Sequence, residues 1–212
     1  LELALDRYEH TLGDASLRAF LTARSGLPGA HADLDLANTF AENVAARATS
    51  PSADEWWTLC RDFALMPASR APTNDPAEFL CICGTLAASA IACIDGDHLS
   101  ECLAILRRQA IDPRWRLRDA TVVGLLRLLL VWRTETLSAL DDWTGQGNPL
   151  HLRAAVKVLS EPAVLGSAEV VESAVRVHEL AIEALLRTKR PLSPAWRTLR
   201  LALGTSIGAL VL

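Results

Sequence analysis

The residues best suited to carry chemistry in this sequence lie between Arg114 and Asp119. Trp115 precedes Asp119 by four residues, so a helix through both would place their side chains on one face. Arg114, Arg116 and Arg118 lie around them, and guanidinium groups bind carboxylates or phosphates through paired hydrogen bonds. An indole ring stacks on flat ligands, and a carboxylate stabilises a cation or accepts a proton. The segment predicts a binding surface, in which Asp119 is the one candidate for a catalytic group.

Two residues further along the chain extend this set. Trp196 repeats Trp115 at an offset of 81 residues, and Arg153 repeats Arg118 at an offset of 35. Equivalent positions on successive helices would bring these side chains to one surface. The alternative is structural: both tryptophans would pack between neighbouring helix pairs, and both arginines would hydrogen-bond to a neighbouring repeat.

Signatures of common enzyme classes are missing from the sequence. It has no G-x-S-x-G, no G-x-G-x-x-G and no phosphate-binding loop. The five histidines share no metal-ligand spacing: His10, His31, His98, His151 and His178. We therefore expect neither a metal nor another cofactor, and we expect a binding protein rather than an enzyme.

The cysteines indicate a reducing compartment. They are five, an odd number, and they lie in apolar runs without a C-x-x-C pair: Cys60, Cys81, Cys83, Cys93 and Cys102. Such residues are typical of reduced thiols in the core of a cytoplasmic protein. The apolar run over 122–132 is interrupted by Arg127, and no basic segment precedes a long apolar stretch at the beginning, so we expect neither a membrane span nor a signal peptide.

Charge is distributed unevenly along the chain, whose formal net charge is −4. Residues 1–100 hold 6 basic and 14 acidic residues, whereas residues 101–212 hold 15 and 11. Seven arginines fall between positions 103 and 133. This cluster predicts a patch that faces an anionic ligand, with a solvated face of local ion pairs as the alternative.

The elements that must position these residues are helices in a repeated arrangement. A capping residue followed by proline recurs with steps of 37, 36 and 45 residues, at Asp75-Pro76, Asp112-Pro113, Asn148-Pro149 and Ser193-Pro194. Proline suits the first turn of a helix, and Asp, Asn or Ser before it can accept a hydrogen bond from that turn. An apolar run follows each pair, so each pair predicts the start of a helix.

The predicted organisation is one all-α domain over residues 1–212. Residues 1–50 form an irregular helical cap, with helices near 2–12, 14–24 and 33–48. About four helix hairpins follow over 51–212, and we expect these pairs: 52–65 with 75–94, 97–110 with 112–132, 134–146 with 148–159, and 167–189 with 193 onward.

Two details of these helices are also predicted. Ser52 with Glu55, and Asp75 with Glu78, have the spacing of a capping box, in which the Glu reaches back to the N–H of the capping residue. Neighbouring residues on a helix point about 100° apart. Of the adjacent pair Trp56-Trp57, we therefore expect only one ring to face the core.

The segment 112–120 resembles the HEAT-repeat signature: an Asp-Pro turn, then an apolar residue with Arg, then Ala two residues later, opening the second helix of a hairpin. Segment 148–155 is a second match. Segment 75–83 matches except that Cys81 replaces the arginine, and 193–202 matches with one inserted residue. This resemblance implies an α-α superhelix of the armadillo type, a solenoid in which the proline-led helices line the concave side.

A weaker resemblance is to the bacterial DNA alkylation repair glycosylases of HEAT-like fold, whose groove uses Trp, Asp and Arg on successive repeats. It implies that Asp119 faces the glycosidic bond or the attacking water. It also implies that Trp115 and Trp196 are groove aromatics and that Arg153 contacts a phosphate.

Two functional hypotheses follow. The first is a non-catalytic scaffold that binds a macromolecular partner, with a protein expected before DNA, through its concave surface. The alternative is a DNA-binding protein or alkylpurine DNA glycosylase. Convergence of Trp115, Asp119, Arg153 and Trp196 in one groove would favour the second hypothesis. An Asp119 buried in a structural ion pair with Arg118 or Arg153 would exclude catalysis.

Overall fold

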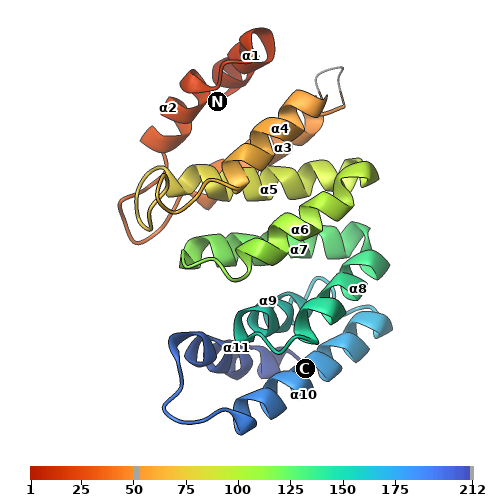
Figure 1. Cartoon of the computed structure of the whole chain (residues 1–212). Coiled ribbons are helices and arrows are strands. Elements are labelled where there is room, and N and C mark those ends of the chain that lie inside the picture. The colour runs from red at the N-terminus through yellow and green to blue at the C-terminus, as the bar shows by residue number, and fades with distance from the viewer. Residues whose placement is uncertain (50–52, 211–212) are drawn as a thin grey trace.

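The computed structural model describes residues 1–49 and 53–210, which form eleven α-helices, one short 3-10 helix over residues 96–98 and no strand (Figure 1). The all-helical class predicted from the sequence is therefore confirmed. The α-helices are α1 (Glu2–Thr11), α2 (Ala15–Ala23), α3 (Leu34–Arg47), α4 (Ala53–Ala64), α5 (Glu78–Ile94), α6 (Leu99–Gln109), α7 (Trp115–Val131), α8 (Arg133–Thr144), α9 (Pro149–Leu159), α10 (Ala168–Arg187) and α11 (Pro194–Leu210).

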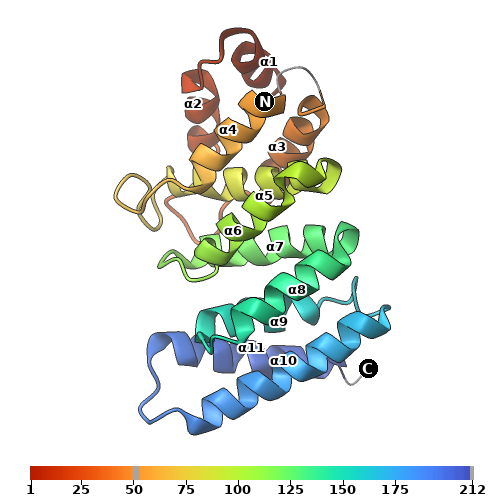
Figure 2. The same cartoon turned by 45° about the vertical axis from the view of Figure 1, so that its right-hand side comes forward.

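The helices from α3 onward lie in two layers (Figures 1 and 2). Helices α3, α5, α7, α9 and α11 follow one another in one layer, and each contacts the next. Helices α4, α6, α8 and α10 lie in the other layer, where they pack on α5, α7, α9 and α11 respectively. Helices α1 and α2 lie at the N-terminal end of the stack.

The proline-led helices begin in two different ways. At α9 the helix starts at Pro149, and Asn148 Oδ1 accepts a hydrogen bond of 2.9 Å from the N–H of Leu150. Before α5 and α7 the Asp-Pro pair instead makes a turn, and the helix starts two residues after the proline. There the Asp side chain accepts from the N–H two residues later, at 2.8 Å in both Asp75 and Asp112. Short side chains of this kind stabilise such turns.

The expected capping box at Asp75 is shifted by one residue. Glu78 Oε2 accepts a 2.7 Å hydrogen bond from the N–H of Asn74, because the N–H of Asp75 donates to the carbonyl oxygen of Pro72 at 3.1 Å. Ser52, which begins the other expected capping box, lies outside the described residues.

Helix α5 is the centre of the core. Nearly all its side chains are buried, because α3, α4 and α7 pack around it. A Cβ atom added at Gly84 would collide with the carbonyl oxygen of Cys60 and the backbone nitrogen of Ala64, both on α4. The missing side chain at Gly84 therefore lets α4 and α5 approach closely.

Both members of the Trp56-Trp57 pair are buried, so the expectation that only one faces the core is wrong. The ring of Trp56 contacts Tyr8 of α1, with 4.7 Å between ring centroids. Trp57 stacks on His98 at 4.2 Å, and its Nε1–H donates to Glu101 Oε2 at 3.0 Å. The prediction failed because α4 is covered from two directions, by α1 and by the start of α6.

Candidate functional site

A cavity of about 380 Å³ opens between the loop before α3 and the helices α5 and α7. Its walls combine apolar side chains with a few polar ones. The lining residues are Ala30, His31, Ala32, Asp33, Leu34, Asp35, Asn38, Ile82, Leu86, Trp115, Arg116, Asp119, Ala120 and Val123. Three of the residues singled out in the sequence, Trp115, Arg116 and Asp119, thus meet at one site.

Trp115 is the first residue of α7 and is 45 % exposed, a large fraction for an indole ring. The guanidinium of Arg116 lies over its ring, 4.4 Å from the ring centroid. This cation–π contact holds the indole in place. The exposed part of the ring is available to a ligand that enters the cavity.

Arg116 is a structural residue of the cavity wall, since it is only 8 % exposed. Its Nη2 donates to the carbonyl oxygen of Gly29 at 2.6 Å and to that of Ala30 at 3.3 Å, and its Nη1 lies 3.4 Å from the fully buried carboxylate of Glu78. These contacts fasten the loop before α3 to α5 and α7. Arg116 therefore builds the site and does not reach outward to a partner.

Asp119 lies one turn after Trp115 and forms an ion pair with two cations of α9. Its Oδ1 is 2.5 Å from Arg153 Nη2 and 3.2 Å from Lys157 Nζ. Burial raises the pKa of this carboxyl, but the hydrogen bond from Arg153 and the charge of Lys157 outweigh that effect, so the pKa of Asp119 is lowered. Asp119 is therefore ionised at neutral pH, and its side chain is 40 % exposed.

The N-terminal side of the cavity is acidic. Asp33 Oδ1 accepts a hydrogen bond of 2.9 Å from the N–H of Leu36 and so caps α3. Asp33 and Asp35 are exposed, and both line the cavity together with Asp119. The one arginine of the lining, Arg116, is engaged with loop carbonyls. The entrance is therefore better suited to a cationic or neutral group than to a phosphate.

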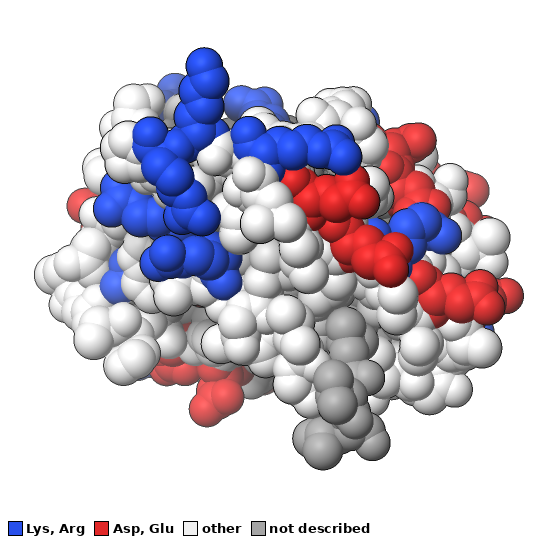
Figure 3. Space-filling view, turned by 90° about the horizontal axis from the view of Figure 1, so that it is seen from below, with Lys and Arg blue, Asp and Glu red and all other residues white. Residues whose placement is uncertain are grey.

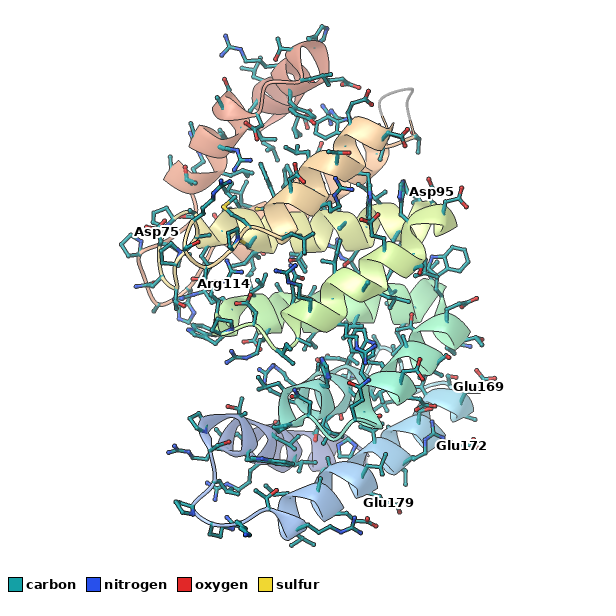
Figure 4. The ribbon with its side chains drawn as sticks, viewed as in Figure 1. Asp75, Asp95, Arg114, Glu169, Glu172 and Glu179 are labelled. Carbon is teal, nitrogen blue, oxygen red and sulfur yellow. The ribbon has the colours of Figure 1, made fainter. Side chains whose placement is uncertain are left out.

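Two other arginines of the candidate set stabilise the turn before α7. Arg114 lies just before α7 and is 3 % exposed (Figure 4). It donates to both carboxylate oxygens of Asp112 at 2.8 Å and to the carbonyl oxygen of Ala71 at 3.1 Å. Arg118 donates to the carbonyl oxygens of Asp112 and Pro113 at 2.5 and 3.0 Å. The guanidinium of Arg114 is therefore engaged on all sides, whereas Arg118, which is half-buried, uses its Nη1 within the turn.

Four of the seven arginines in the predicted anion-facing patch are therefore engaged inside the molecule, whereas Arg108 and Arg133 are exposed. Arg127, like the arginines near the start of α7, is used inside the molecule, where it donates to the carbonyl of Leu86 at 3.1 Å and to Asn38 Oδ1 at 2.9 Å. Backbone carbonyls accept about half of the hydrogen bonds from Arg114, Arg116, Arg118 and Arg127. The alternative of local ion pairs covers only some of the remaining contacts, those with Asp112 and Glu78.

Trp196 and Arg153 do not line the cavity. Trp196, near the start of α11, is partly buried against the core. Arg153 affects the cavity only indirectly, because its ion pair holds the carboxylate of Asp119 in place. The expected groove of Trp115, Asp119, Arg153 and Trp196 thus reduces to Trp115 and Asp119, with Arg153 behind the carboxylate.

Sequence reasoning missed two features of the surface. The first is the acidic wall from the loop before α3, which no local pattern connects to α7. The second is an exposed basic cluster at the C-terminal end of the molecule (Figure 3). It consists of Arg187, Lys189, Arg190, Arg197 and Arg200. A signal for this cluster was present, because residues 184–212 contain no Asp or Glu.

No family model, curated protein or solved structure matches this chain. Within the described ranges, every helix falls short of the length and apolar character needed to cross a membrane. In the same ranges, His, Cys, Asp and Glu side chains nowhere gather in a group of three or more that could hold a metal ion.

Proposed function

We propose that this protein is a non-catalytic helical-repeat scaffold of the HEAT type, and that it binds a protein partner at the cavity beside Trp115. The observation that carries the proposal is the half-exposed indole at a largely apolar cavity of about 380 Å³. Exposed aromatic side chains next to apolar pockets are typical anchor points of protein interfaces. The cavity has room for one or two apolar side chains of a partner.

The charges around the cavity suggest which partner segment would fit. The carboxylates of Asp33 and Asp35 lie on the loop side, and their charge favours Lys or Arg beside the apolar anchor of the partner. Asp119 already has two cationic neighbours and would contribute less. The best ligand is then a peptide with one large apolar residue flanked by basic residues.

Selection from a displayed peptide library tests this proposal. We expect binders with an apolar residue flanked by Lys or Arg, and we expect Trp115→Ala to weaken their binding by about tenfold or more, the cost of losing an interface anchor. Leu130→Ala is the matched control, because Leu130 lies on the same helix and is 53 % exposed but does not line the cavity. Peptides that bind the Trp115→Ala variant as tightly as the unchanged protein would refute the proposal.

The second candidate function is that of a DNA-binding protein or alkylpurine DNA glycosylase. One observation favours it: Trp115 and the ionised Asp119 line the same cavity, and Asp119 stays 40 % exposed despite its pairing with Arg153. Incubation with a duplex that carries an alkylated base tests it. Release of the alkylated base by the unchanged protein but not by the Asp119→Asn variant would establish glycosylase activity. Absence of release and of DNA binding at low salt would exclude it.

We also propose a cytoplasmic location. All five cysteines are free, and burial raises the pKa of each thiol. Reduced, unreactive thiols of this kind suit a reducing compartment. Neither a metal nor another cofactor is part of the proposed activity.

A further inference from the structure

Helix α10 carries a stripe of apolar side chains that no other described helix covers. Val171, Val175, Ile182 and Leu186 are 37 %, 47 %, 39 % and 76 % exposed. Since each helical residue turns by 100°, these four side chains fall within an arc of about 60°. Water-exposed apolar side chains gathered on one face mark an interaction surface.

The stripe lies on one flank of α10, between the buried inner side of the helix and an outermost row of glutamates, Glu172, Glu179 and Glu183. On the opposite flank of α10, Arg176 donates to both carboxylate oxygens of Asp141 on α8, at 2.8 and 2.9 Å. His178 and Ser173 lie on the inner side of α10 and are buried. The stripe therefore belongs to the C-terminal end surface of the molecule, the surface seen in Figure 3.

The spacing of the stripe is symmetric. Its residues are separated by steps of 4, 7 and 4, so their midpoint lies between His178 and Glu179. Two antiparallel copies of α10, related by a two-fold axis at this midpoint, would place Val171 opposite Leu186 and Val175 opposite Ile182 of the other copy. A self-complementary patch of this kind is what a two-fold interface requires.

The charges at the two ends of α10 follow the same symmetry, and Glu179 and Glu183 lie between these ends. Glu169 and Glu172 lie near its N-terminal end (Figure 4). Arg187 lies at its C-terminal end, and Lys189 and Arg190 follow it. Figure 3 shows Lys and Arg on one side of this surface and Asp and Glu on the other. In an antiparallel pair, the acidic end of each helix meets the basic end of the other, and the helix dipoles are also opposed.

We propose that a second copy of this chain docks on the α10 stripe, and that the two α10 helices pack antiparallel about a two-fold axis near residues 178–179. An anionic membrane would suit the basic end alone. It would leave Glu169 and Glu172, at the other end of α10, without a cationic partner. A second copy uses the apolar stripe, the basic end and the acidic end together.

Molar mass in solution, measured by light scattering over a concentration series, tests the docking. We expect twice the chain mass of 22.9 kDa for the unchanged protein. Val175→Glu should weaken dimerisation by about tenfold or more, because it places a charge in the apolar contact. Leu180→Glu is the matched control: Leu180 is 42 % exposed on the same helix but lies on the other flank. Circular dichroism establishes that both variants remain folded.

A charge exchange tests the antiparallel orientation. Glu169→Lys and Lys189→Glu should each weaken the dimer, and the double variant should recover much of the loss, because it restores opposite charges across the axis. A second readout is disulfide formation in a Val175→Cys, Ile182→Cys variant, since the native cysteines are buried or half-buried.

Three outcomes would overturn the proposal: a monomer at every concentration, a dimer unaffected by Val175→Glu, or a double charge variant weaker than both single variants. A monomer that sediments with vesicles of phosphatidylserine and phosphatidylcholine would assign the surface to a membrane instead.

Discussion

At the scale of single residues, the arginines in α7 and just before it show how strongly backbone carbonyls compete for guanidinium groups. Arg114, Arg116, Arg118 and Arg127 each donate to at least one main-chain oxygen of a loop or neighbouring helix. The sequence identified Trp115 and Asp119 correctly as neighbours on one helix face, because that relation is local. It could not show which arginines stay exposed, since the acceptors lie up to 87 residues away.

Loss of the charge at Arg116 should lower the stability of the protein. Arg116→Met leaves the fully buried carboxylate of Glu78 without its cation and frees the loop at Gly29, so we expect a loss of about 3 kcal/mol in the free energy of unfolding. Urea denaturation measures it. Combining Arg116→Met with Glu78→Gln should cost less than the sum of the two single changes, and strict additivity would show that the pair is not coupled.

The ion pair of Asp119 predicts a pH dependence. Its pKa is lowered in the folded state, so its contribution is present above the unfolded pKa of about 3.9 and is lost as the pH falls through the folded value. We expect Asp119→Asn to lower the free energy of unfolding by about 1 kcal/mol at pH 7, since solvent screens this half-exposed group. The difference from the unchanged protein should shrink towards pH 3. An equal difference at both pH values would contradict the assignment.

At the scale of the helices, the sequence predicted most of the pattern. The proline positions located the second helix of each pair because caps and prolines act locally, although Asp-Pro turns delay α5 and α7 by two residues. The burial of both Trp56 and Trp57 could not be predicted in this way. The packing of the whole molecule decides which helices cover α4.

Two glycines make a matched test of helix packing. Gly84→Ala should destabilise the protein by about 1–3 kcal/mol, because its new methyl group would overlap the α4 backbone. Gly204→Ala on α11 meets nothing within 4 Å and should be stabilising by up to about 1 kcal/mol. Thermal unfolding of both variants measures the contrast. Equal effects would show that α4 and α5 are not in close contact.

At the scale of the whole molecule, the cavity exists because two distant segments meet. The loop before α3 and the first turns of α7 are more than 80 residues apart, and Arg116 joins them. No sequence pattern indicates that these two segments lie side by side. The residues of the site on α7 could therefore be predicted, whereas those on the loop before α3 could not. The C-terminal end surface is separate from the cavity, which allows partner binding and self-association in the same molecule.

Hydrogen–deuterium exchange with and without a selected peptide tests the central claim most directly. If the cavity beside Trp115 is the binding site, the peptide should slow exchange in two separate segments, residues 30–38 and 115–123, and leave α10 unchanged. Protection confined to α10 and α11, or spread without preference over the chain, would contradict a binding site at this cavity.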